Sequence, residues 1–143
     1  MSIYASDAQL YSCLQALFGI IQAHDPKAAD ALLKASLAIT FNCSTPEAAV
    51  TIDARRSPVK FLFGQADLKP TIEVDLAADT LHCLLLGEIR LTKAIGSDLL
   101  SLKGPVWKTL SLADIFHHAQ RFYPDVLVDN GLPASCPDSL RPR

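Results

Sequence analysis

The adjacent histidines His117 and His118 are the residues of this chain whose type and spacing come closest to a catalytic group. Asp114 lies three and four residues before them, so on a helix its carboxylate can contact either ring and orient it as a base. No serine or cysteine nucleophile stands beside them in the sequence. The pattern therefore favours histidines that lie on a helix surface, or form a hydrogen bond at the edge of a core, over an active site.

Two further groups of residues have side chains that can bind a metal or share a proton. His82 and Cys83 are metal-ligand types, but the chain has no CxxC or HExxH motif and no second cluster at ligand spacing. Asp75, Asp79 and Glu88 form a loose acidic group, in which helix capping accounts for Asp79. We therefore expect no catalytic residue, no metal and no cofactor. Isolated glycines mark the ends of helices and strands rather than a phosphate loop: Gly87, Gly96 and Gly104.

The composition narrows the class of protein. The chain has 143 residues, which is the size of one domain with its own core. Its formal net charge is −2 and its basic residues form no run, which argues against nucleic-acid binding and against a polybasic membrane anchor. Half of the residues are hydrophobic and the mean hydropathy is +0.23. This surplus of apolar side chains predicts either a ligand cavity or an oligomer interface.

The ends and the apolar runs indicate the compartment. Residues 1–10 lack the charged start and apolar run of a signal peptide. The longest apolar stretches, Leu17–Ile21 and Leu84–Leu86, are far shorter than the ~20 residues that span a bilayer. We therefore expect a cytoplasmic protein without a transmembrane segment. In the cytoplasm we expect reduced thiols at all four cysteines, Cys13, Cys43, Cys83 and Cys136.

The hydrophobic period changes from helical to strand-like near residue 36. Ser6 and Gln9 have the spacing of a capping box before an amphipathic helix that ends near His24, and Asp25 begins a second helix that runs to about Ala35. Each of the next four apolar segments then alternates apolar and mostly polar residues, which predicts a largely antiparallel sheet with one face in water. These four strands cover residues 36–43, 48–55, 59–63 and 72–76.

The remaining chain predicts further helices and one more strand. A short helix starts at Ala78 or Asp79, and Thr92 caps another. Ser111 and Asp114 have capping spacing for a last helix, which ends at Tyr123-Pro124. A fifth strand lies between the short helices and the last one, over residues 99–103. Residues after 130, rich in proline and serine, predict a loosely ordered tail.

This order of elements, together with several short motifs, resembles the sterol carrier protein type two (SCP-2) domain family over roughly Asp7 to Tyr123. The resemblance implies an α+β fold, in which a five-stranded, largely antiparallel sheet is covered on one face by about five helices, with an apolar cavity between the layers. With the composition of the last residues, we expect a lipid-binding domain of this kind at 1–130 and a loosely ordered tail at 131–143. The motifs are VKFLFG at 59–64, DLAAD at 75–79, LGE at 86–88, LTKAI at 91–95 and LKG at 102–104.

The chain also departs from parts of that family. It ends in RPR at 141–143 and not in the Ser-Lys-Leu-like tripeptide of peroxisomal members, so we do not expect peroxisomal targeting. The segment PVWK at 105–108 and the residues from Pro124 onward resemble a prokaryotic subgroup, for which sterols need not be the ligands.

The resemblance suggests where a lipid would bind. Arg90 and Lys93 are candidates for the headgroup at the cavity mouth. Trp107 lies either at that mouth or between the last helix and the sheet. Each apolar candidate can also be ordinary core, because apolar residues at strand or helix spacing usually are. The candidate cavity-lining residues are Phe61, Phe63, Leu81, Leu84, Leu85, Ile95, Leu102, Leu112, Ile115 and Phe116.

The resulting functional hypothesis is non-catalytic binding and transfer of an apolar lipid: a fatty acid, acyl-CoA, phospholipid, sterol or isoprenoid. The alternative is an accessory or scaffold protein that binds lipid or isoprenoid-quinone biosynthesis enzymes through an apolar interface. An enzyme is a third class, which no local motif supports. The expected partners are a lipid or fatty-acyl ligand and lipid-metabolism enzymes, with transient membrane contact and an oligomer both left open.

Overall fold

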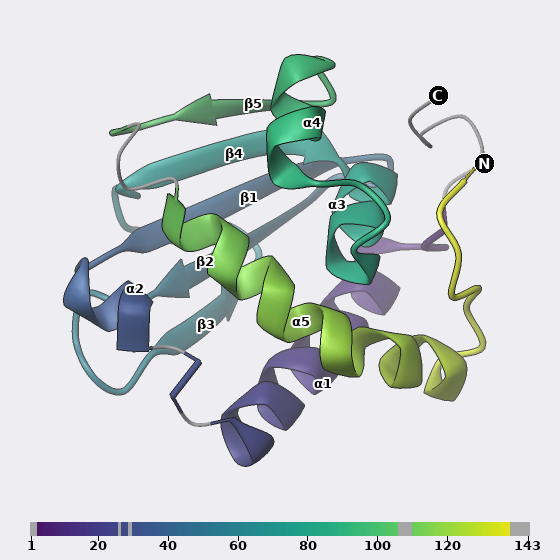
Figure 1. Cartoon of the computed structure of the whole chain (residues 1–143), viewed down its shortest axis with the longest axis horizontal. Coiled ribbons are helices and arrows are strands. Elements are labelled where there is room, and N and C mark those ends of the chain that lie inside the picture. Colours follow the sequence, from purple (N-terminus) through teal and green to yellow (C-terminus); the bar gives the residue numbers. More distant parts are fainter. Residues whose placement is uncertain (1–2, 26, 29, 106–109, 138–143) are drawn as a thin grey trace.

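The computed structural model describes residues 3–25, 27–28, 30–105 and 110–137; the side chains of residues 31 and 110–112 lie outside this description. The described residues form one five-stranded sheet with helices packed on one of its faces (Figure 1). This arrangement confirms the predicted α+β fold.

The sheet is mixed but mostly antiparallel. Its strand order is β3-β2-β1-β4-β5, in which the central pair β1 and β4 is parallel and the other three pairs are antiparallel. The parallel pair requires a crossover, which the chain makes through β2 and β3. The strands run over Ala38–Ser44 (β1), Ala48–Asp53 (β2), Lys60–Phe63 (β3), Ile72–Ala77 (β4) and Leu100–Lys103 (β5).

The alternation along the strands separates a buried apolar face from a more polar one. Phe41 points inward, where its ring packs against Phe116 at 6.1 Å between centroids. On the opposite face the Thr40 and Thr51 hydroxyls share a hydrogen bond of 2.9 Å across the β1–β2 pair. The alternation with a period of two therefore predicted correctly which side chains of each strand point toward the core.

In the described part of the chain, five helices accompany the sheet: α1 (Asp7–His24), α2 (Asp30–Lys34), α3 (Ala78–Leu86), α4 (Leu91–Gly96) and α5 (Leu110–Asp129). The predicted cap of α1 at Ser6 is confirmed, since Gln9 N donates to Ser6 Oγ at 3.2 Å. The return bond differs from that of a capping box, because Gln9 Oε1 accepts from Ala5 N instead of from the N–H of Ser6. Gly87 ends α3 in a left-handed conformation with φ 79°. Figure 1 shows α5 crossing the sheet, flanked by α1 and α3.

Two predicted helix starts and one predicted capping residue were wrong. The helix expected from Asp25 begins only at Asp30, because the backbone of Asp25 ends α1 and its carboxylate is held by His118. Thr92 lies inside α4, whose N-cap residue is Arg90. Asp79 lies in the first turn of α3 and accepts a hydrogen bond from Ile3 N at 2.8 Å instead of capping the helix.

The last helix continues six residues further than predicted, since α5 passes through Pro124 to end at Asp129. A proline inside a helix costs ~3 kcal/mol. Val126 and Leu127, which follow it, are almost fully buried, and each such side chain contributes roughly 1.5–3 kcal/mol by leaving water. The free energy gained by burying these two residues therefore offsets the cost of the proline. A rule based on local sequence does not include this burial.

The prediction of four reduced cysteines was wrong for two of them. Cys83 and Cys136 form a disulfide with a Cα–Cα distance of 5.1 Å, and both residues are buried. Cys13 and Cys43 are free and buried. The disulfide joins Cys136 to α3, and Cys136 N also donates to a carboxylate oxygen of Glu88, which follows α3, at 2.9 Å. The division of the chain at residue 130 stays a prediction.

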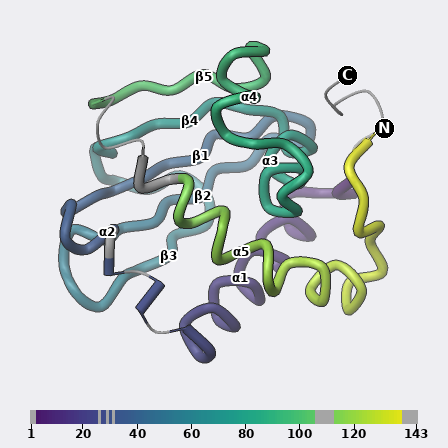
Figure 2. The backbone as a smooth tube through the Cα atoms, viewed as in Figure 1, coloured from purple at the N-terminus to yellow at the C-terminus, as the bar shows by residue number. Residues whose placement is uncertain are grey.

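A buried chain of polar groups joins the two ends of the molecule beside that disulfide. His82 Nε2 lies 2.9 Å from the Ser135 carbonyl oxygen and Nδ1 lies 2.7 Å from the Tyr123 hydroxyl, which also contacts the Tyr4 hydroxyl. A carbonyl only accepts, so Nε2 donates to it, and neutral His82 then accepts from Tyr123 at Nδ1. Figure 2 shows the yellow C-terminal segment returning to the purple N-terminal end of the tube.

The neutral state of His82 predicts how stability depends on pH. Burial lowers the pKa of His82 below its ordinary value. As the pH falls below about 6.5, the unfolded chain binds a proton at this site before the folded protein does. The free energy of unfolding is therefore expected to decrease on acidification, until the pH has passed the lowered pKa of the folded state.

Urea unfolding at about pH 7.5 and about pH 5.5 measures this effect. The matched variant is His82→Gln, whose amide can donate to the Ser135 carbonyl oxygen and accept from Tyr123 but does not titrate. We expect a smaller loss of stability on acidification in this variant than in the original protein. Equal losses in both proteins would contradict the assignment of this pH dependence to His82.

Candidate functional site

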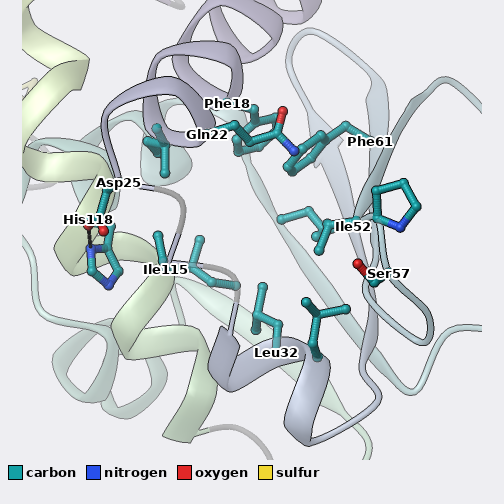
Figure 3. Close-up of a pocket in the computed structure, with 14 residues that line it drawn as sticks. Phe18, Gln22, Asp25, Leu32, Ile52, Ser57, Phe61, Ile115 and His118 are labelled. Carbon is teal, nitrogen blue, oxygen red and sulfur yellow. Dashed lines mark ion pairs between the residues drawn. The ribbon is translucent and has the colours of Figure 1, made fainter.

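An apolar pocket of about 280 Å³ lies between one edge of the sheet and the helices (Figure 3). It is bordered by the end of α1, the following turn, α2, the first half of α5, β2 with β3 and the turn between these two strands. The pocket is lined by Phe18, Ile21, Gln22, Asp25, Ala28, Leu32, Leu33, Ile52, Ser57, Pro58, Val59, Phe61, Ile115 and His118.

Aromatic stacking forms one wall of this pocket. The ring of Phe18 on α1 lies parallel to that of Phe61 on β3, with 4.4 Å between centroids and an interplanar angle of 14°. Phe61 pairs in register with Ile52 on β2, so both side chains face the helices. The apolar stripe of α1 faces β3, so the stripe and the strand together produce a largely apolar wall, on which the Gln22 side chain of α1 lies beside Phe61 (Figure 3).

An ion pair lies at the opposite wall. His118 Nδ1 on α5 is 2.8 Å from a carboxylate oxygen of Asp25, the residue that ends α1. The predicted partner of the histidine pair was Asp114, but Asp25 supplies the carboxylate because α1 and α5 pack side by side. His117 points away from the core and is exposed.

The Asp25–His118 pair does not form a catalytic triad with the one lining hydroxyl of this pocket. Ser57 lies on the opposite side of the pocket in Figure 3, and no hydrogen bond joins it to His118 in the described part of the chain. A nucleophile and its base need a separation of about 2.6–3.2 Å. Among the described residues there is also no group of three or more His, Cys, Asp or Glu side chains that could hold a metal ion.

A second, charged hollow adjoins the apolar pocket at the turn between β2 and β3. Its lining residues are Asp53, Arg55, Arg56 and Lys60, together with Ser57 and Pro58, which line both hollows. The Arg55 guanidinium donates two hydrogen bonds, of 2.9 and 3.0 Å, to the two carboxylate oxygens of Asp53. These bonds hold the pKa of the Asp53 carboxyl below its ordinary value, so Asp53 stays ionised.

The predicted lining residues are distributed over the whole interface between helices and sheet. Phe61 and Ile115 line the apolar pocket. Ile95 is 40% exposed, and the side chains of Leu112 and Trp107 lie outside the described residues. The others contribute to the core instead of the pocket wall: Leu81, Leu84, Leu85 and Phe116 are buried, and Phe63 and Leu102 are half-buried.

The predicted headgroup residues lie elsewhere on the surface. Arg90 and Lys93 are exposed on α4, and neither lines the apolar pocket. The residues that sequence reasoning missed come from the end of α1, from α2 and from the β2–β3 turn. The apolar stripe of the first helix, which includes Phe18 and Ile21, was a signal for the α1 contribution. No signal in the sequence marked Ser57 or Pro58 as more than a turn.

Within the described residues no helix has the length and the apolar character needed to cross a bilayer. The sequence has no match among curated proteins.

Several solved structures share the fold of this chain. Sterol carrier protein 2 from Yarrowia lipolytica, in its apo form, is 21% identical with a TM-score of 0.55, over 66% of this chain and 77% of its own. Sterol carrier protein domain 2 of Helicoverpa armigera is 15% identical with a TM-score of 0.64, over 79% and 89%. A structure described as UbiJ-SCP2 ubiquinone synthesis protein is 14% identical with a TM-score of 0.56, over 75% and 84%.

A family model matches the sequence as well as the fold. The model of the SCP-2 sterol transfer family matches residues 18–117. Of the described elements, this range includes all five strands and, wholly or in part, all five helices. It also contains thirteen of the fourteen residues that line the apolar pocket, all except His118.

Counted by element, the matched range contains α2, α3 and α4 entirely and parts of α1 and α5. The match therefore spans more than half of the chain and all five strands. The fold of the solved structures agrees with it. The chain belongs to the SCP-2 sterol transfer family.

Proposed function

We propose that this protein binds and transfers an apolar lipid without catalysing a reaction. The observation that carries the proposal is the apolar pocket between helices and sheet, in a chain whose family is named for sterol transfer. The ligand classes proposed are a fatty acid, acyl-CoA, phospholipid, sterol or isoprenoid. The proposed location is the cytoplasm.

The volume of the pocket limits the size of the ligand that it can hold without movement of the surrounding side chains. At about 280 Å³ it lies near the lower end of the roughly 300–1,000 Å³ typical of small-molecule sites. Each methylene that leaves water contributes ~0.8 kcal/mol, so part of an acyl chain yields several kcal/mol before ordering costs. A longer ligand has to displace side chains between the layers.

We propose that a long acyl chain displaces side chains between helices and sheet and thereby reaches the other predicted lining residues. From Phe61 and Ile115 it would extend between helices and sheet toward Phe63, Leu84 and Leu102. We expect affinity to increase about fourfold per methylene from octanoate through dodecanoate to hexadecanoate, because each methylene is buried. Isothermal titration of this series measures the increase. A plateau at octanoate would confine the ligand to the pocket and contradict the extension.

The direct test of the function is native mass spectrometry of gently purified protein, followed by organic extraction of any bound molecule. We expect a near-stoichiometric lipid, whose identity gives the ligand class. A protein that carries no lipid and takes up no fluorescent fatty acid would overturn the proposal.

A scaffold is the second candidate function, favoured by the similarity in fold to the UbiJ-SCP2 ubiquinone synthesis protein. A scaffold for isoprenoid-quinone or other lipid biosynthesis enzymes would use its apolar surface as an interface. It would form a stable complex and hold no lipid. A pull-down combined with lipid extraction of the same complex separates the two functions, since a carrier brings down lipid and a scaffold brings down enzymes.

A further inference from the structure

We propose that two copies of this protein associate by pairing their β5 strands edge to edge, so that their two five-stranded sheets become one continuous sheet. The partner is a second copy of the same chain, and the interface is the free edge of β5 (Leu100–Lys103). The inference goes beyond the proposed lipid binding and does not depend on it.

The register of the sheet determines which residues of β5 present unpaired main-chain groups. The main-chain groups of successive residues in a strand point alternately to its two neighbours. Ala54 N donates to Leu37 O, which assigns the odd-numbered residues of β1 to β2 and its even-numbered residues to β4. In the parallel register, even-numbered residues of β1 bond to even-numbered residues of β4. The odd-numbered residues of β4 therefore bond to the odd-numbered residues of β5, and the main-chain groups of Leu100 and Leu102 point outward.

This edge of the sheet is open. β5 is the outermost strand, and within the described part of the chain no strand other than β4 pairs with it (Figure 1). The side chains of Ser101 and Lys103 are exposed. At the opposite edge α1 packs against β3, where the ring of Phe18 stacks on that of Phe61. An unpaired strand edge is a template for the addition of another strand, so β5 is the edge at which we expect pairing.

The edge of β5 is complementary to itself. When two β5 strands pair antiparallel with Ser101 opposite Ser101 of the second copy, Leu100 lies opposite Leu102 of the second copy. Such a pair exchanges two hydrogen bonds between its main-chain groups. Two-fold symmetry produces the same pair twice, so four hydrogen bonds join the copies. Every outward main-chain group of these two leucines then has a partner on both copies.

The side chains of β5 suit the same register. On the helix side of the sheet, the leucine pairs bring apolar side chains together and cover Leu102, which is half-buried in a single copy. On the other side, the two serines at the centre are small and uncharged. The two copies of Lys103 lie at opposite ends of the paired strands, and each remains 3.8 Å from Asp75 of its own copy. No like charges therefore face each other directly.

An exposed apolar side chain beside this edge also favours a protein partner. Ile95 on α4 is 40% exposed, and Val128 is the other large hydrophobic side chain that is exposed among the described residues. Leu99 N donates to Ala94 O, so the end of α4 lies beside the beginning of β5. In an antiparallel pair, the end of β5 of the second copy runs along this beginning and approaches Ile95.

The first test is the mass of the intact protein, measured by sedimentation equilibrium over a series of concentrations. We expect the mass to rise from the 15.5 kDa of one chain toward twice that value, with a dissociation constant of about 100 µM, because a pair of short strands forms a small interface. Ser101→Glu should weaken the association about tenfold or more, since two carboxylates then face each other across the two-fold axis.

The matched control is Ser44→Glu. It places the same charge at an exposed serine on the same face of the sheet, at the end of β1 and away from the edge of β5. We expect this variant to associate like the original protein. Equal melting temperatures of the two variants in dilute solution establish that their folds are comparable.

A pair of cysteine variants tests the register. Residue 101 faces its copy at a non-hydrogen-bonded position, where the Cα atoms are about 4.5 Å apart and a disulfide can form. Ser101→Cys is therefore expected to give a covalent dimer on oxidation, which a non-reducing gel detects. Lys103→Cys is the control on the same strand, because its two cysteines would lie roughly 14 Å apart and cannot be bridged.

Three results would overturn the proposal. A constant mass of 15.5 kDa up to the highest concentration would show that the edge binds no second copy. Association that Ser101→Glu leaves unchanged would place the interface elsewhere on the molecule. Equal cross-linking of Ser101→Cys and Lys103→Cys would contradict the register, and with it the self-complementarity on which the pairing rests.

Discussion

Ala28→Trp is expected to lower the affinity for a long-chain lipid about a hundredfold. Ala28 lies in the turn after α1 and lines the apolar pocket with a small, half-buried side chain. An indole at this position occupies the volume that the acyl chain would fill. Excluding about four methylenes costs roughly 3 kcal/mol, which corresponds to the stated factor. Displacement of a fluorescent fatty acid measures the change.

The control is Ala66→Trp, which places the same ring at another half-buried alanine outside the helices and strands, away from the pocket lining. We expect unchanged lipid affinity there. Both variants should melt near the temperature of the original protein, because neither residue belongs to the buried core. A folded Ala28→Trp protein with full affinity would show that the ligand does not use this pocket.

Cys136→Ala is expected to lower the free energy of unfolding by about 4 kcal/mol. The bond to Cys83 closes a loop between residues 53 positions apart, and loop-closure entropy gives ~4 kcal/mol for that length. Its loss also frees the segment that carries the Ser135 carbonyl oxygen, the acceptor for buried His82. Urea unfolding of the original and variant proteins under oxidising conditions measures the difference.

A reducing agent provides the internal control for this prediction. It should destabilise the original protein by a similar amount and leave Cys136→Ala unaffected. Cys13 and Cys43, which are free and buried, are present in both proteins and so cancel in the comparison. If reduction had no effect on the original protein, the disulfide would not contribute to stability.

Thiol labelling of the protein in intact cells bears on its location. Cytosolic proteins are kept reduced, whereas disulfides persist in oxidising compartments. For a cytoplasmic protein we expect Cys83 and Cys136 to be reduced in the cell. A thiol reagent that is added before lysis, and stays present while the protein is unfolded, should then modify both residues. Protection of both residues would contradict the proposed location.

The alternation of apolar and polar residues was sufficient to predict the sheet. Each strand has its own period of two, so the inward position of Phe41, Ile52 and Phe61 follows from neighbouring residues alone. The helix cap at Ser6 is equally local, because the bonds of Ser6 and Gln9 join residues three and four apart. Local rules failed at Pro124, where burial of residues on the far side of the proline extended the helix.

The site depended on contacts between distant parts of the chain. His118 pairs with Asp25 because α5 packs against α1, and nothing near His118 in the sequence indicates that partner. The pairing of Cys83 with Cys136 likewise follows from how the last described segment returns to α3.

The sequence by itself determined the fold class, the inward face of each strand and the family, because these depend on short periods and motifs within single elements. Only the tertiary structure decided which apolar residues border a pocket and which belong to the closed core. Phe61 and Leu84 have equally apolar side chains, yet Phe61 faces the gap beside α1 while Leu84 is buried. The physical reason is that a pocket is the space left between packed elements, and packing is set by residues far apart in the sequence.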